Sequence, residues 1–159
     1  PVMFFEYKRI YTSKGEVPDG EYTIPIGQAD IKREGEDATV VAIGPMVQKS
    51  LDAAVALEDD GYDIEVVDPR SLSPLDVDTI CASVRKTGRA IVCGEDSTFA
   101  GAASEIAAMI SENCFGDLKA PVRRIGSPHV PMPFSSELVK HVVPEKSHVI
   151  DAVNQSMAA

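Results

Sequence analysis

Several features are scarce in this sequence of 159 residues. It contains no tryptophan, and aromatic residues make up 6% of it. No apolar run approaches the roughly 20 residues that a membrane-spanning helix needs, so we expect no membrane partner. Basic residues are also few, since 15 Lys and Arg stand against 25 Asp and Glu, for a formal net charge of −10. Because nucleic acids bind basic surfaces, this balance argues against a nucleic-acid partner. A solvated acidic surface is its simplest interpretation, and recognition of a basic partner is the alternative.

Cysteine is rare as well. Cys81, Cys93 and Cys114 form no CxxC pair. Each lies among apolar residues of a predicted helix or strand, which favours buried, reduced thiols in a reducing compartment over disulfides or a zinc site.

Motifs for catalysis are missing too. The histidines His129, His141 and His148 have no HExxH-type spacing, and no GxSxG occurs. We therefore expect no catalytic, metal-binding or cofactor-binding residue within this chain.

What the sequence does contain is an alternation of strand and helix patterns. Short apolar runs predict buried strands at 40–43, 64–67, 90–93 and 122–125. Apolar residues at helical spacing predict helices after Pro45, after Asp76, from about 103 to 110, and from about 145 to 156. This order is typical of a three-layer α/β/α sandwich. A run at 29–32 is joined to the next strand by a short loop, which predicts one antiparallel edge strand on a mostly parallel sheet of about five strands.

Residues 1–27 have a different texture. An apolar start, Pro1 to Phe5, leads into a loop rich in Gly, Pro, Asp and Glu. A structureless stretch of this length is unusual inside a compact domain. We expect residues 1–27 to be an inter-domain connector from a missing N-terminal domain, and residues 28–159 to form the folded domain.

Three side chains near the carboxyl ends of predicted strands are candidates for interface or ligand-facing positions: Arg70, Glu95 and His129. Arg70 could pair with Asp68, with Asp76 or with an acid across an interface. Prolines at 128 and 131 could hold the His129 ring in one direction. A capped loop, ordinary packing and a surface histidine are the bland alternatives at these positions.

Gly44 follows a predicted strand and opens a helix, where an anion could bind the helix N-terminus. The sequence Gly44-Pro45-Met46 has neither GxGxxG spacing nor the lysine of a P-loop. An independent anion- or nucleotide-binding module is therefore an alternative function.

One segment is more specific. Residues 68–76, DPRSLSPLD, resemble the D-x-R-[ST]-L-x-P-x-D segment of the transketolase C-terminal domain. The stretches PVMFFEYKRIY, KTGRAIVCGED and APVRRIGSPHVPMPFS resemble the beta subunits of thiamine-diphosphate-dependent 2-oxo acid and acetoin dehydrogenases. The chain departs from the family's G-x-G-A-E at Gly101-Ala102-Ala103-Ser104-Glu105, and has Val139 where a glutamate is frequent.

The resemblance implies a parent enzyme and a place for this domain in it. The parent would be a heterotetramer of alpha and beta subunits that carries out oxidative decarboxylation or C–C cleavage of a 2-oxo acid (pyruvate or branched-chain) or acetoin, and passes the acyl group to lipoamide. Thiamine diphosphate and magnesium would lie between the alpha subunit and a pyrimidine-binding domain upstream of Pro1, so none is expected on this chain alone.

The implied partners are the alpha subunit, a second beta subunit, and the subunit-binding domain of the dihydrolipoyl acyltransferase, contacted near the C-terminal helix. A cytoplasmic location is expected, or the mitochondrial matrix in a eukaryote. The C-terminal domain of a transketolase or a 1-deoxyxylulose-5-phosphate synthase is the alternative parent, which the FFEYK and VPMPF segments fit less well.

Overall fold

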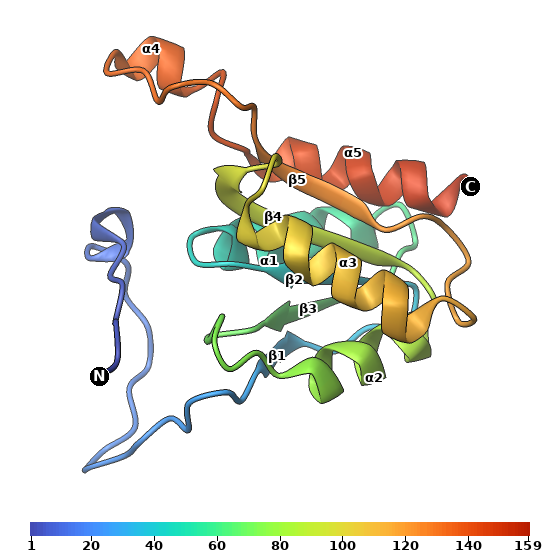
Figure 1. The fold of residues 1–159 in the computed structure, drawn as a ribbon, viewed down its shortest axis with the longest axis horizontal. Helices are drawn as coiled ribbons and strands as arrows, with labels where there is room; N and C mark the ends of the chain where they lie inside the picture. Colours follow the sequence, from blue (N-terminus) through green and yellow to red (C-terminus); the bar gives the residue numbers. More distant parts are fainter.

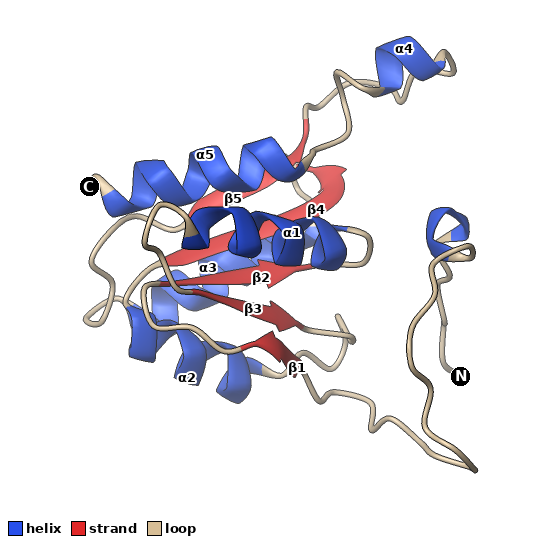
Figure 2. Ribbon diagram, turned by 180° about the vertical axis from the view of Figure 1, so that it is seen from behind, coloured by secondary structure: helices blue, strands red, loops and turns tan.

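The computed structural model describes residues 1–159 and contains one five-stranded sheet with helices on both faces (Figures 1 and 2). The strands are β1 (Asp30–Arg33), β2 (Ala38–Ala42), β3 (Ile64–Asp68), β4 (Ala90–Ser97) and β5 (Arg123–Ser127). The helices are a 3₁₀ turn η1 (Lys8–Ile10), then α1 (Met46–Glu58), α2 (Val77–Thr87), α3 (Ala102–Cys114), α4 (Ser136–Val139) and α5 (Lys146–Met157).

The strand order is β1-β3-β2-β4-β5. Strand β1 pairs antiparallel with β3, and the remaining neighbours are parallel. The short loop between β1 and β2 reverses the chain without room for a crossover helix, so β1 runs antiparallel to the other strands. It pairs with β3, however, and not with β2, the strand that follows it in the sequence. The predicted α/β/α sandwich with one antiparallel edge strand is therefore confirmed.

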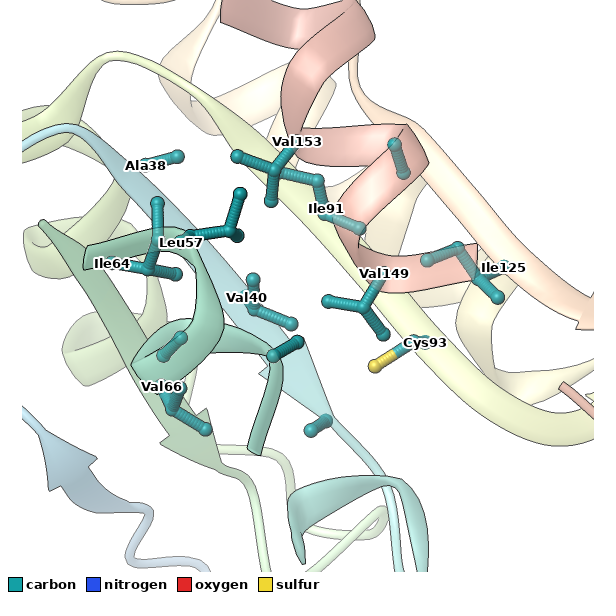
Figure 3. Close-up of a cluster of buried hydrophobic side chains, with 14 of the residues drawn as sticks. Ala38, Val40, Leu57, Ile64, Val66, Ile91, Cys93, Ile125, Val149 and Val153 are labelled. Carbon is teal, nitrogen blue, oxygen red and sulfur yellow. The ribbon is translucent and has the colours of Figure 1, made fainter. Parts of the chain in front are cut away.

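Two apolar clusters hold the layers together. Strand side chains that point to one face, such as Val40, Val66 and Ile91, pack against Leu57 of α1 and Val153 of α5 (Figure 3). The alternate residues of the same strands pack against α2 and α3 on the other face. Because both faces are covered, β2 is buried along its whole length, which explains why its residues other than Thr39 are apolar.

Helix α2 shows how local sequence sets an element's ends. The Asp76 carboxylate accepts a hydrogen bond from the Thr79 N–H at 3.1 Å and caps the helix, as predicted. Gly88 ends the helix at φ +76°, and its N–H donates to the Val84 carbonyl. A glycine suits this left-handed position because it has no Cβ to clash.

Two segments lie outside the layered body: residues 1–26 and an arm of residues 128–143 that carries α4 (Figure 1). Every side chain from Pro1 to Ile26 is exposed, and η1 is the one regular turn there. The helix α4 was not predicted from the sequence. None of the helices has the length and apolar character required to cross a membrane. The assignment of residues 1–27 as an inter-domain connector stays a prediction.

Candidate functional site

The carboxyl ends of β2, β3, β4 and β5 share one edge of the sheet because these strands are parallel. The edge carries Gly44 after β2, Asp68 to Arg70 after β3, Glu95 and Asp96 in β4, and His129 after β5. The three candidate residues therefore lie at one end of the molecule, the end at which α/β proteins place their functional groups.

Arg70 pairs with an acid that the sequence did not suggest. Its guanidinium donates to the Asp30 carboxylate at 2.6 Å, whereas its backbone N–H donates to Asp68 Oδ1 at 2.9 Å. The antiparallel pairing places Asp30 directly opposite Asp68, within reach of the arginine. The expected pairing of the guanidinium with Asp68 or Asp76 is therefore wrong, and Arg70 instead ties the edge strand β1 to the end of β3.

The carboxylates around Arg70 have perturbed pKa values. A hydrogen bond from Lys32 and the nearby Arg70 lower the pKa of Asp30 against the opposing effect of burial. Burial raises the pKa of Asp68, although the hydrogen bond from the Arg70 backbone opposes the shift. These shifts follow from ordinary burial and ion pairing, and no nucleophile lies between the groups.

Glu95 is the centre of an ion-pair network. Its Oε1 lies 3.5 Å from Lys49 Nζ of α1 and 3.6 Å from Arg9 Nη1 of η1. The same lysine lies 3.2 Å from the Glu145 carboxylate and donates to the Pro144 carbonyl at 2.6 Å. Glu95 therefore connects the N-terminal turn, α1 and the start of α5.

Asp96 lies beside the first turn of α3. Its Oδ2 accepts a hydrogen bond from the Ala103 N–H at 3.4 Å, which suits a carboxylate at a helix N-terminus. A Cβ on Gly101 would collide with this carboxylate and with the Ser97 carbonyl. The absence of a side chain at Gly101 thus permits the start of α3 to approach the end of β4 closely.

His129 packs its ring against Phe99. The ring centroids are 4.8 Å apart with an interplanar angle of 55°. Phe99 belongs to the loop between β4 and α3, so the pair joins the ends of β4 and β5. His129 has no partner acid or nucleophile there. Its contact with Phe99 is an exposed packing contact.

The arrangement favours recognition over acid–base catalysis. The side chains of the chain form no group of three or more His, Cys, Asp or Glu that could hold a metal ion. All three cysteines are free and buried. A groove of 750 Å³ lies between α3 and the segment that leads into β5. Its lining contains no carboxylate, histidine or cysteine. None of the three candidate residues reaches it.

Sequence reasoning missed Tyr7, Arg9 and Lys49. Tyr7 and Arg9 reach the carboxyl edge from a segment without regular pattern, and Lys49 reaches it from the first turns of α1. The one hint in the sequence is Gly44 after β2, which is an alternative candidate for anion binding. The structure places the Tyr7 ring against this glycine.

Comparison with known proteins identifies the domain. The family model described as "Transketolase, C-terminal domain" matches residues 27–149. The chain is 47% identical over 150 residues to the acetoin:2,6-dichlorophenolindophenol oxidoreductase subunit beta of Bacillus subtilis, covering 94% of this chain and 44% of that protein. It is 51% identical over 136 residues to the pyruvate dehydrogenase E1 component subunit beta of the same organism, covering 85% of this chain and 42% of that protein.

A solved structure agrees with these matches. A split-gene transketolase, described as an inactive β4 tetramer, superimposes with a TM-score of 0.73 at 29% identity and covers 91% of this chain and 46% of that one. The chain therefore spans a little under half the length of the relatives it matches. The family match over most of the chain, together with the sheet order and the antiparallel edge strand, shows that this protein belongs to the transketolase C-terminal domain family.

Proposed function

We propose that this chain serves subunit assembly in a thiamine-diphosphate-dependent dehydrogenase, as the C-terminal domain of its beta subunit. Its relatives include beta subunits of an acetoin oxidoreductase and of a pyruvate dehydrogenase. The proposed parent carries out oxidative decarboxylation or C–C cleavage and transfers the acyl group to lipoamide. Residues 1–27 would connect this domain to a pyrimidine-binding domain upstream.

The distribution of exposed apolar side chains carries the proposal. Val130, Met132, Phe134 and Leu138 are all exposed on the arm, and Phe134 has no cover at all. Phe4, Phe5 and other apolar side chains of the N-terminal segment are exposed as well. Large apolar groups gathered on segments outside the core mark surfaces that another protein covers. Both segments project from the carboxyl end of the sheet (Figure 1).

The chemistry of the parent would come from thiamine diphosphate, which supplies the reactive centre when bound. The residues of this chain do not fit that cofactor. No Gly-Asp-Gly opens a diphosphate-binding motif in the sequence, and no cluster of carboxylates could hold its magnesium ion. We therefore place the cofactor between the alpha subunit and the upstream domain, and give this chain the role of holding the subunits together. The same role would include contact with a second beta subunit and with the acyltransferase subunit-binding domain near α5.

A chimeric subunit tests the proposal. This chain would replace the matching half of the Bacillus subtilis acetoin oxidoreductase beta subunit, and the chimera would be produced together with the matching alpha subunit. We expect a heterotetramer by light scattering and reduction of 2,6-dichlorophenolindophenol with acetoin. A well-folded chimera that never associates with the alpha subunit or with itself would contradict the assembly role.

A matched pair of variants locates the interface within the chimera. Phe134→Ser alters an uncovered side chain of the arm, and Phe115→Ser alters another exposed phenylalanine, 82% exposed, at the end of α3. Loss of assembly is expected for the first variant, with little change for the second.

Titration of the 159-residue chain alone with thiamine diphosphate and Mg²⁺ should release no heat of binding at micromolar concentrations. Micromolar binding would show that the chain holds a cofactor site.

A transketolase is the second candidate parent, because the split-gene transketolase structure shares the fold at 29% identity. The same half-chain exchange in that enzyme distinguishes the two. Activity restored in the transketolase chimera, but not in the acetoin chimera, would favour it.

A further inference from the structure

The sheet has a topological switch point between β2 and β4. The chain leaves β2 toward α1 on one face and leaves β4 toward α3 on the other. Open α/β sheets bind their ligands at the position where neighbouring strands lead to opposite faces. Here that position is marked by Gly44 at the end of β2 and by Glu95 and Asp96 in β4.

The position is filled by the chain's own N-terminal turn. A Cβ on Gly44 would lie 2.6 Å from Cε2 and Cζ of Tyr7, so the hydroxyl-bearing edge of the ring takes the space that a side chain here would need. Gly44 also has a φ of +57°, which disfavours any other residue. The glycine thus provides both the turn out of β2 and the space that the edge of the ring occupies.

Tyr7 is less exposed than the other large apolar side chains of the N-terminal segment. Its exposed fraction is 39%, compared with 85% for Phe4 and 61% for Tyr11. Burial, followed by the charges of Glu95 and Asp96, raises the pKa of the Tyr7 hydroxyl. Of the large apolar side chains before Gly27, Tyr7 is the least exposed.

A charged contact accompanies the ring. Arg9, two residues further along, places its guanidinium 3.6 Å from Glu95, the carboxylate that also lies beside Lys49. The site therefore offers room beside Gly44 for the edge of an aromatic ring and an acid for the cation that follows. These two features match a Tyr-x-Arg segment and do not resemble a phosphate site, which needs free N–H groups and positive charge.

We propose that the switch point is an intramolecular docking site for Tyr7–Ile10, and that Gly44 and Glu95 are its recognition residues. The docked turn occupies the place where related architectures admit a ligand. It also fixes where the N-terminal segment leaves the domain, and so sets the orientation of whatever precedes it. The docking depends on contacts within this chain and stands independently of the proposed thiamine enzyme.

Limited trypsin digestion of the full chain measures the docking. Lys8 and Arg9 lie in the docked turn, whereas Lys14 lies beyond it in the same exposed segment. Cleavage after Lys8 should be slower than cleavage after Lys14, because proteolysis follows the population of the open form. Equal rates at the two sites, unchanged by Tyr7→Ala, would overturn the proposal.

Two tyrosines provide a matched comparison. Tyr7→Ala should accelerate cleavage after Lys8 by about fivefold or more, as expected when the undocked population grows. Tyr11→Ala removes the same side chain four residues away, where its hydroxyl donates to Glu6, and should change the rate less than about twofold. An equal effect of both variants would contradict docking through Tyr7.

A double-mutant cycle isolates the charged contact. Arg9→Gln and Glu95→Gln should each accelerate cleavage after Lys8, and the double variant should be no faster than the faster single variant. Arg85→Gln is the control, since Arg85 pairs with Asp117 at 3.5 Å far from the site. Multiplicative effects of the two substitutions would show that Arg9 and Glu95 act separately and would remove Glu95 as a recognition residue.

The outcomes of the digestion experiments can be distinguished from those of the chimera experiment. An active chimera whose N-terminal turn shows no protection would overturn the docking alone. Intact protection in a chain whose chimera never assembles would overturn the proposed function alone.

Discussion

Glu65 is a charged side chain with no exposure to solvent. It lies in β3, accepts a hydrogen bond from the Gly35 N–H at 3.2 Å, and forms an ion pair with Lys86 of α2. Its Oε1 has no hydrogen-bond partner. A buried carboxylate of this kind depends on its cation, because an unpaired charge in the interior costs several kcal/mol.

We predict that Lys86→Met destabilises the protein by about 3 kcal/mol, the lower end for a broken buried ion pair, because Lys86 itself is partly exposed. Urea unfolding at pH 7 measures the loss. Lys140→Met is the control, since Lys140 pairs with an exposed Glu137 and should change stability by less than about 1 kcal/mol. A loss in Lys86→Met no larger than the control would show that water screens Glu65.

The pH dependence of this pair has a definite sign. The hydrogen bond to Glu65, with a second contribution from Glu34, raises the pKa of Lys86 well above its ordinary value. The contribution of Lys86 to stability is therefore complete below about pH 10, the pKa of an unfolded lysine, and is lost as the pH rises through the higher folded value. The difference between wild type and Lys86→Met should accordingly stay constant from pH 7 to 9.

Buried thiols give another residue-scale prediction. Burial raises the pKa of Cys93 to about 12 and that of Cys81 to about 11. Since the thiolate is the reactive form, both thiols should be inert at pH 8. Titration with a thiol-reactive disulfide reagent should find no rapid reaction in the native protein and three thiols in urea. A thiol that reacts within seconds in the native state would contradict this placement.

At the scale of elements, Asp76 joins two of them. It caps α2 through Thr79, and its Oδ2 accepts a hydrogen bond from the Ala29 N–H, just before β1, at 2.8 Å. Burial alone would raise the pKa of Asp76, but the hydrogen bonds from Ala29 and Thr79 lower it below its ordinary value. The same carboxylate therefore stabilises the helix start and the entry to the edge strand.

Asp76→Ala should cost about 1–2 kcal/mol at pH 7, the usual loss for a removed helix cap. The stabilisation is present above the unfolded pKa of about 3.9 and disappears as the pH falls through the lower folded pKa. The difference in urea midpoint between wild type and variant should therefore be much larger at pH 7 than at pH 2.5. Asp78→Ala, in the first turn of the same helix, should cost less than about 0.5 kcal/mol. An equal loss at both positions would argue against the cap.

The sequence predicted those elements whose burial leaves a pattern. Apart from Thr39, Glu65 and Asp68, β2 and β3 are apolar because both faces are covered, and α2 has a cap at one end and Gly88 at the other. The last four residues of β4, Gly94 to Ser97, read as a loop from their composition. They are extended because Ser97 pairs with Ser127 after a shift in register, which only the tertiary structure supplies. The single turn of α4 is too short to show periodicity.

The sequence predicted where the candidate residues lie but not which residues they contact. The carboxyl ends of the strands do bring Arg70, Glu95 and His129 to one edge. The partner of Arg70 depended on β1 lying antiparallel beside β3, and the partners of Glu95 come from residues 40 or more positions away in the chain. Such contacts leave no local trace in the sequence, so the spacing of residues could not reveal them.

At the scale of the whole molecule, order is concentrated in the layered body. Strands β2 and β4 are each paired on both sides, and their apolar residues are buried against helices on both faces. Residues 11–26 and the arm around α4 have exposed side chains and few hydrogen bonds to the body. The protein therefore combines a buried core with two extensions whose apolar side chains are exposed.

Native-state hydrogen exchange should reproduce this division. The amides of β2, β3 and β4 should exchange most slowly, near the limit set by global unfolding, because opening them requires the helices on both faces to separate. Amides of residues 12–26 and 128–142 should exchange at nearly unprotected rates, and the edge strands should fall between. If the arm were as protected as β2 in the isolated chain, its apolar side chains would already be covered, and the assembly role proposed for Phe134 would lose its basis. Protection of the arm that appears only when the partner subunit is added is the result that the structure leads us to expect.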